Sequence, residues 1–349
     1  MNQNLFIKLA RILATVIGVM GMGVAFPRSS WGQSIIAQQL SSPGSERPEE
    51  LSLAEASQLT QQALELYQQG KYSEAIPLAK RALEIRQEVL GEEHLDVASS
   101  LNNLAFIYFR QGRYAKAEPL YLQALALRKK LLDQDHHDVA GSFNNLALLY
   151  KSQGRYAEAE PLYRQALALL KKLFGQDHPH VARSLNNLAT LYESQGRYSE
   201  AEPLHQQALA LREKLLSEDH PDVARSLNNL AALYQSQGRY PEAEPLYQQA
   251  LALRKKLLSE DHPDVAESLN NMATLYQSQG RYPEAEPLFL QALALTKKLL
   301  GENHPHVARS LHNLAFIYES QGRYGEAEPL FLQALALMET LLGQDHPDV

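Results

Sequence analysis

Histidine, the commonest metal ligand among side chains, recurs once in every 42 residues of the chain. The series is His94, His136, His178, His220, His262, His304 and His346. Successive members stand one helix pair apart, and packed helices lie about 8–10 Å from one another. All ligands of one zinc ion lie about 2 Å from it, so the series cannot share an ion. We expect each histidine to cap the start of a helix, and we predict no metal site.

Paired asparagines recur with the same period and could bind a peptide. The pairs are Asn102-Asn103, Asn144-Asn145, Asn186-Asn187, Asn228-Asn229 and Asn270-Asn271, and His312-Asn313 breaks the pattern. Each amide offers donors and an acceptor, so a row of them could bind the backbone of an extended peptide with little regard to its sequence. The alternative is that each asparagine ties one helix to its neighbour. Both interpretations stay open.

Positions that differ between periods are the ones that could select a ligand. One helical turn before the first asparagine stand Ser99, Gly141, Arg183, Arg225, Glu267 and Arg309; one turn after it stand Phe106, Leu148, Thr190, Ala232, Thr274 and Phe316. Arg183 and Arg225 could hold a carboxylate by charge-assisted hydrogen bonds. Phe106 and Leu148 could form an apolar pocket nearby. The alternative is a solvated face whose residues drift without consequence.

Nothing in the sequence points to catalysis or to a cofactor. The chain has no cysteine, which excludes a disulfide framework and a cysteine nucleophile. No Ser/His/Asp set stands out from the periodic background, and no glycine-rich phosphate loop follows a strand. With a net charge of −7, we expect no nucleic-acid surface. The paired lysines are interpreted as solvated helix ends; they are Lys129-Lys130, Lys171-Lys172, Lys255-Lys256 and Lys297-Lys298.

The elements that position these residues are predicted to be stacked helical hairpins. A fixed period of this size is the signature of a repeat architecture. Leu227, Leu230 and Tyr234 give one apolar stripe at helical spacing, which predicts a first helix of about 17 residues. Gly238 suits a left-handed helix end. After a three-residue turn, the stripe from Ala243 to Leu251 predicts a second helix of about 18 residues.

The pattern Leu227-x2-Leu230-Ala231-x2-Tyr234, followed by Ala243-x3-Tyr247, resembles the tetratricopeptide repeat (TPR). The period is 42 rather than 34, and the words NNLA, QGRY, EAEPLY and HPDVA look like the repeats of kinesin light chains and their bacterial relatives. The resemblance covers residues 52–349. It implies an all-α solenoid, a right-handed superhelix of seven repeats, whose asparagine-bearing flank faces a concave groove. Kinesin light chains are understood to bind short acidic peptides containing tryptophan, so the resemblance also implies an acidic-aromatic peptide ligand.

The chain divides into five predicted parts. Residues 1–32 form a signal peptide, because Lys8 and Arg11 precede a 15-residue apolar run that ends before small residues. An uncleaved membrane anchor is the alternative. Residues 33–50 form a flexible linker, 51–94 an atypical first repeat, 95–346 six repeats, and 347–349 the start of a further helix. We expect an exported protein, periplasmic or secreted, and we expect the chain to be a fragment.

We therefore predict a non-catalytic scaffold that binds a protein or peptide in its groove; its oligomeric state stays open. One rival is the regulatory arm of a larger exported enzyme with a caspase-like peptidase domain. Another is a cargo adaptor of the kinesin light chain type, which the export signal and the missing heptad coiled coil disfavour. An RNA-binding repeat protein is disfavoured by the acidic balance. The predicted groove residues are Asn102, Asn103, Asn144, Asn145, Asn186, Asn187, Asn228, Asn229, Asn270, Asn271, Asn313, Arg183, Arg225, Arg309, Phe106 and Leu148.

Overall fold

The computed structural model describes residues 48–133 and 135–342, and these residues contain fourteen helices and no strand. The helices are α2 (Pro48–Gln68), α3 (Tyr72–Leu90), α4 (Leu95–Arg110), α5 (Tyr114–Leu131), α6 (His137–Ser152), α7 (Tyr156–Phe174), α8 (Pro179–Ser194), α9 (Tyr198–Leu216), α10 (Pro221–Ser236), α11 (Tyr240–Leu258), α12 (Pro263–Ser278), α13 (Tyr282–Leu300), α14 (Pro305–Ser320) and α15 (Tyr324–Leu342). The predicted all-α fold of repeated hairpins is confirmed. The expected signal peptide, the linker up to residue 47 and residues 347–349 lie outside the described residues.

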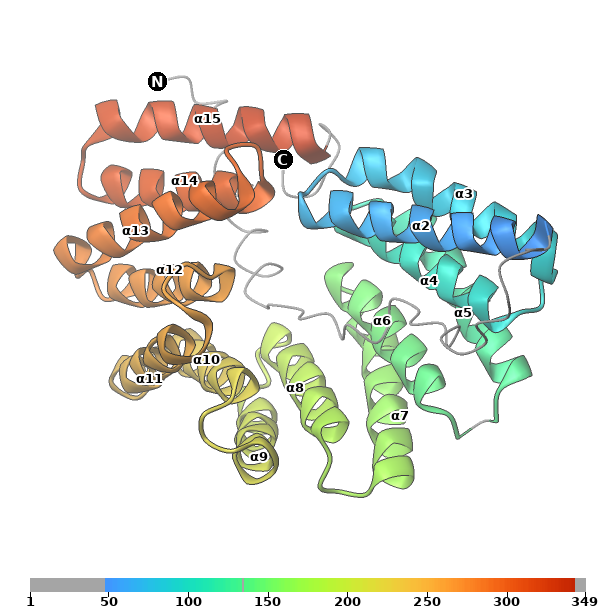
Figure 1. Ribbon diagram of the computed structural model, residues 1–349. Helices are drawn as coiled ribbons and strands as arrows, with labels where there is room; N and C mark the ends of the chain where they lie inside the picture. The colour runs from blue at the N-terminus through green and yellow to red at the C-terminus, as the bar shows by residue number, and fades with distance from the viewer. Residues whose placement is uncertain (1–47, 134, 343–349) are drawn as a thin grey trace. The chain divides into compact units, whose positions relative to one another are not determined.

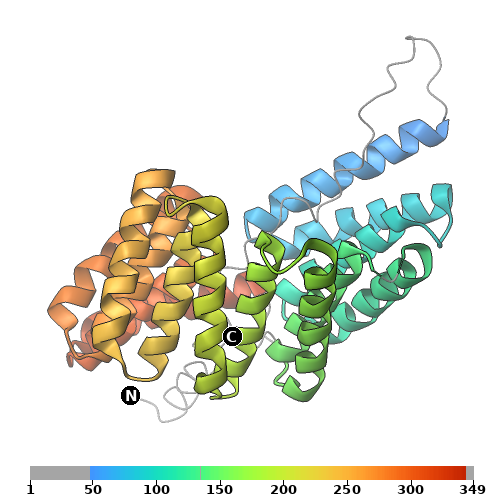
Figure 2. The ribbon, with the colours of Figure 1, turned by 90° about the horizontal axis from the view of Figure 1, so that it is seen from below.

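The described helices belong to two compact units. The N-terminal unit ends at Leu173 and the C-terminal unit begins at Phe174. We call the even-numbered helices A and the odd-numbered helices B. Successive helices lie side by side from α2 to α6 in the first unit and from α8 to α15 in the second, as Figures 1 and 2 show. Helices α3, α5, α9, α11 and α13 are thereby each shared between their own helix A and the next one.

A histidine starts helix A in each hairpin after the first. His220 has extended backbone, and its Nδ1 accepts a hydrogen bond from the backbone N–H of Asp222 at 3.1 Å. This bond satisfies one of the N–H groups that a helix start leaves without a partner. The same cap recurs at His94, His136, His178, His262 and His304. The predicted capping role is confirmed at these six positions, and His346 lies outside the described residues.

A three-residue turn joins helix A to helix B. Helix α10 ends at Ser236, and Gly238 follows with φ of 72°, a conformation that would cost other residues about 1–2 kcal/mol. The N–H of Arg239 then donates to the carbonyl of Tyr234 at 2.8 Å, which closes the turn. Helix A has 16 residues and helix B has 19, each within one residue of the expected length.

Alanines at the contact between helices let them approach closely. Ala231, Ala243 and Ala250 are each 0% exposed, and Tyr247 at 2% fills the space beside them. Alanine is buried at the same three positions in the other hairpins of each unit. The core is therefore a row of small contacts between neighbouring helices rather than one central mass.

An arginine at each turn joins one hairpin to the preceding one. The guanidinium carbon of Arg239 lies 4.0 Å from the centroid of the Tyr234 ring, and its Nη1 lies 2.8 Å from Oε2 of Glu202 in α9. Its Nη2 lies 2.6 Å from Oε2 of Glu242, and this hydrogen bonding lowers the pKa of the Glu242 carboxyl. We call this group the arginine clamp; it recurs at Arg155, Arg281 and Arg323.

Replacing Ala243 with leucine should lower the free energy of unfolding by about 1–3 kcal/mol, because the added methylene groups have no space at a fully buried contact. Urea denaturation followed by far-UV circular dichroism measures the change. Ala252→Leu, at an exposed position on the same helix, is the control and should change stability by less than about 0.5 kcal/mol. Equal denaturation midpoints for the two variants would contradict the packing described here.

Candidate functional site

The predicted site residues lie on one face of the A helices, which we call the asparagine face. The first asparagine of most pairs is buried: Asn102 and Asn270 are 5% exposed, Asn186 4% and Asn228 2%, whereas Asn144 is half-buried. The second asparagine is half-buried in Asn145, Asn187, Asn229, Asn271 and Asn313, and buried in Asn103. The second position therefore offers more of its amide to a ligand than the first.

Two hydrogen bonds between asparagines join neighbouring hairpins. Nδ2 of Asn145 donates to Oδ1 of Asn102 at 2.7 Å, and Nδ2 of Asn271 donates to Oδ1 of Asn228 at 2.9 Å. In each case the second asparagine of one hairpin binds the first asparagine of the preceding hairpin. At these positions the structure favours the interpretation in which the amides link helices.

Among the described residues, the row of asparagines, which we call the ladder, lacks such hydrogen bonds between hairpins elsewhere in the C-terminal unit. Nδ2 of Asn270 donates to the carbonyl of Ala266 in its own helix at 3.1 Å, and its buried Oδ1 has no hydrogen-bond partner. The side-chain amides of Asn229 and Asn313 form no hydrogen bond within the described residues. These two half-buried amides are therefore available to a ligand.

Three arginines gather beside the interrupted part of the ladder. Arg212 in α9 is 2% exposed; its Nη1 donates to Oγ of Ser226 at 2.6 Å and to the carbonyl of Asp222 at 3.1 Å. Nη2 of Arg225 lies 2.7 Å from Oδ1 of Asp222. The half-buried Arg183 has no hydrogen bond or ion pair within the described ranges.

The electrostatics of this cluster favour an anion. Burial, and next the charge of Arg225, lower the pKa of both Arg183 and Arg212, and Asp222 opposes the shift. One carboxylate thus faces three guanidinium groups. A ligand carboxylate would relieve the repulsion among them and provide acceptors for the unpartnered Arg183.

Sequence reasoning missed Arg212. The same position carries a buried arginine in other hairpins, at Arg128 and Arg254, where each also donates to a serine of the next helix A. Aligning the B helices of successive periods would have shown that an arginine recurs at this position within an otherwise apolar stripe.

The other predicted residues differ in how much surface they offer. Phe106 is only 6% exposed, because it packs edge-on against Tyr67 at 5.5 Å between ring centroids and against Phe109 at 6.0 Å. Burial in this aromatic cluster leaves Phe106 little surface for the predicted apolar pocket. Leu148 and Arg309 are half-buried.

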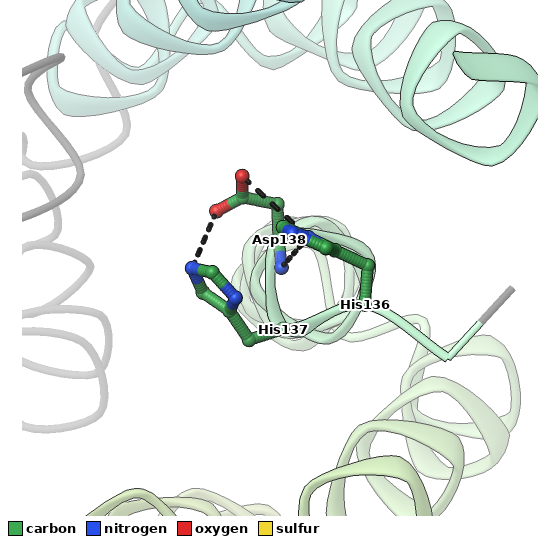
Figure 3. A group of neighbouring side chains, drawn as sticks. All are labelled: His136, His137 and Asp138. Atoms are coloured by element: carbon green, nitrogen blue, oxygen red, sulfur yellow. Dashed lines mark hydrogen bonds and ion pairs between the residues drawn. The ribbon is translucent and has the colours of Figure 1, made fainter. Parts of the chain in front are cut away.

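A group that could hold a metal ion lies at the start of α6, where His136, His137 and Asp138 converge (Figure 3). Nε2 of His137 lies 3.4 Å from Oδ1 of Asp138, and the ring centroids of His136 and His137 lie 4.3 Å apart. However, Nδ1 of His136 accepts the capping bond from the N–H of Asp138 at 3.1 Å. A neutral imidazole in that tautomer carries its proton on Nε2, so binding a metal would cost the cap. The positive end of the helix dipole also disfavours a cation there.

Comparisons with known proteins agree with this geometry. A family model described as tetratricopeptide repeat matches residues 55–130, 138–214, 192–256, 222–297 and 264–340, which is more than half of the chain. No curated protein matches. None of the helices in the described ranges is long and apolar enough to cross a membrane.

Solved structures of TPR proteins are similar to the chain. BtubC (BKLC) from P. vanneervenii is 25% identical, with a TM-score of 0.51 over 73% of this chain and 94% of that one. The nearly identical TPR-like repeats of a Podosopora anserina kinesin light chain are 33% identical over 59% and 97% of the two chains, with a TM-score of 0.48. A Rap protein complexed with Competence and Sporulation Factor is 19% identical over 83% and 76%, with a TM-score of 0.63, and shows the fold alone.

His312 takes the place of the first asparagine in α14, and burial lowers the pKa of its imidazole. A folded-state pKa below the unfolded value of about 6.5 means that stability is present above that pH and is lost as the pH falls. His312→Asn should therefore lose less thermal stability than the wild type between about pH 7.5 and about pH 5, as scanning calorimetry would show. If His312→Asn loses as much thermal stability as the wild type over this pH range, the assignment is wrong.

Proposed function

This chain belongs to the tetratricopeptide repeat family, and on that premise we propose that it is a non-catalytic scaffold that binds a peptide or protein segment along the asparagine face. The repeats and the similar TPR structures support an interaction scaffold. Among the neighbours, the Rap protein was solved with Competence and Sporulation Factor bound, so this fold can hold a ligand. What a scaffold needs is a surface with unused hydrogen-bonding groups, and the asparagine face has them.

The observation that carries the proposal is that two polar side chains on neighbouring A helices, Arg183 and Asn229, have no hydrogen-bond partner within the described residues. Both side chains are half-buried and belong to the C-terminal unit. A half-buried guanidinium that has no acceptor within the described residues can take one from a ligand carboxylate. Its place among Arg212 and Arg225 selects an acidic ligand.

A ligand of this kind would combine two interactions. Amides such as those of Asn229 and Asn313 would bind its backbone, because an amide presents a donor and an acceptor to a peptide group. A carboxylate of the ligand would bind the guanidinium of Arg183, and this contact would set the register of the peptide. A half-buried apolar position on the same face of the C-terminal unit, Phe316, would add a contact for an aromatic residue.

Selection of random linear peptides on the whole chain should enrich acidic sequences. Arg183→Ala should weaken the best of them by about 1.5–3 kcal/mol, a loss of roughly tenfold to more than a hundredfold in affinity, because it removes a hydrogen bond to a charged group. Fluorescence anisotropy measures the change. The control is Arg164→Ala, which removes an equally charged side chain that is 58% exposed on α7.

Two results would contradict the proposal. Equal affinity of the wild type and Arg183→Ala would exclude the guanidinium as a binding group. Enrichment of basic peptides would show that the net negative charge of the chain, and not the arginine cluster, selects the ligand.

We also propose that the protein is exported, from the positive residues and apolar run within residues 1–32. Export followed by cleavage predicts a mature chain that begins near residue 33. Amino-terminal sequencing of the protein isolated from its native cells tests this. A chain that still begins at Met1 would refute cleavage, and its recovery from the membrane fraction would support an anchor instead.

A further inference from the structure

His205 occupies a core position that holds an aromatic ring in the other hairpins of the C-terminal unit. The equivalent residues are Tyr247, Phe289 and Phe331, and all four are buried. In the neighbouring hairpin the hydroxyl of Tyr247 donates to Oε1 of Gln235 at 3.0 Å. The residue equivalent to Gln235 is Glu193, so both members of the pair are titratable in the hairpin of α8 and α9.

The imidazole of His205 is 0% exposed and uses only one of its nitrogens. Nδ1 lies 2.8 Å from the side-chain amide of Asn186 in α8. Nε2 faces Oε2 of Glu193, also in α8, at 3.8 Å and has no hydrogen-bond partner. A buried polar atom without a partner is costly, so this arrangement has a reason to change when the ring gains a proton.

The amide of Asn186 lies between His205 and Arg212, and rotation about its Cβ–Cγ bond presents either its oxygen or its NH2 group to each neighbour. In one orientation, Oδ1 faces Nδ1 of His205 at 2.8 Å, and the NH2 group faces the arginine. In the other, Nδ2 donates to Nδ1 of His205 at 2.8 Å, and Oδ1 accepts from Arg212 at 2.9 and 3.3 Å. The second orientation satisfies both neighbours when His205 is neutral, whereas the first is the one that a protonated Nδ1 requires.

Arg212 links the orientation of the Asn186 amide to the next hairpin. Its Nη1 also donates to Oγ of Ser226 and to the carbonyl of Asp222, both in α10. In the second orientation, Arg212 therefore joins α8 to α10 through α9. In the first orientation, the arginine faces the NH2 group of Asn186 and loses its acceptor in α8.

We propose that His205 is a proton-sensitive switch: protonation of its ring turns the Asn186 amide, releases Arg212 from α8 and loosens the stacking of the α8–α9 hairpin on α10. The switch needs no ligand. Arg212 also belongs to the arginine cluster, where the charges of Arg225 and Arg183 act on it, so the loosening would reach that cluster.

The charged groups around His205 decide whether the folded chain favours or disfavours protonation of the ring. Arg212, which shares the Asn186 amide with His205, disfavours an added positive charge, whereas Glu193 in α8 favours it. Glu193 is partly exposed, also accepts a hydrogen bond from Ser236 at 3.3 Å, and faces the phenol of Tyr247 in α11. Its distance of 3.8 Å from Nε2 exceeds a hydrogen bond, so the clash of donors at Asn186 is the larger effect.

Hydrogen exchange of the whole chain at about pH 7.5 and about pH 5.5 spans the ordinary histidine pKa of about 6.5 and tests the switch. After correction for the intrinsic rates, amides of α8, α9 and α10 should lose more protection on acidification in the wild type than in His205→Tyr, because only the wild type has a ring at this position that can take up a proton. Tyrosine fits this position in the neighbouring hairpin, so the variant should fold, and circular dichroism checks that it does. Helices α2 and α3 of the same samples, which contain no histidine, are the internal control.

Two further variants test the phenol hydroxyl introduced by His205→Tyr and the carboxylate of Glu193 separately. His205→Phe, the residue of the next two hairpins, should behave as His205→Tyr does, which excludes an effect of the phenol hydroxyl. Glu193→Gln should keep or increase the acid sensitivity, because it removes the carboxylate that favours the protonated ring. Equal loss of protection in the wild type and His205→Tyr would overturn the proposal. So would a gain of protection in the wild type that Glu193→Gln abolishes, because an ion pair of His205 and Glu193 would then dominate.

Discussion

The structure depends on the burial of each hairpin against its neighbours. A single hairpin leaves one face of helix B uncovered, and the next helix A of the unit covers it. Alanines without exposed surface set the distance, and the arginine clamp, with a guanidinium 4.0 Å from the Tyr234 ring and 2.8 Å from Glu202, fixes one hairpin to the preceding one. The stability of such arrays is a sum over repeats and their interfaces, so a change in one interface acts mainly on its neighbours.

The sequence predicted the elements well because their signals are local. The histidine cap, the glycine with positive φ and the helical spacing of Leu227, Leu230 and Tyr234 all act within one hairpin, and helix lengths agree within one residue. It could not decide the use of the paired asparagines. Asn145 can bind either a ligand or the side chain of Asn102. Which of the two it binds depends on the distance between side chains that are 43 residues apart in the sequence, and only the packing of the helices sets that distance.

The departures from repetition are the informative positions. Where the period is regular, as at Asn228 and Asn271, the amides satisfy each other. Where His205 replaces an aromatic ring, Asn186 binds within its own hairpin instead, and Asn229 and Arg183 are left without partners in the described ranges. The same irregularity therefore opens the candidate ligand site and places a titratable group behind it.

The central claim is that a partner binds the asparagine face, and site-specific photo-crosslinking tests it most directly. A photoreactive amino acid would replace Ala232, half-buried on α10 one turn after Asn228, and in a second variant Ala252, exposed on α11. With an acidic peptide selected on the wild-type chain as the probe, we expect a crosslink from position 232 and none from position 252. A crosslink from position 252 alone would place the ligand on helix B and contradict the account.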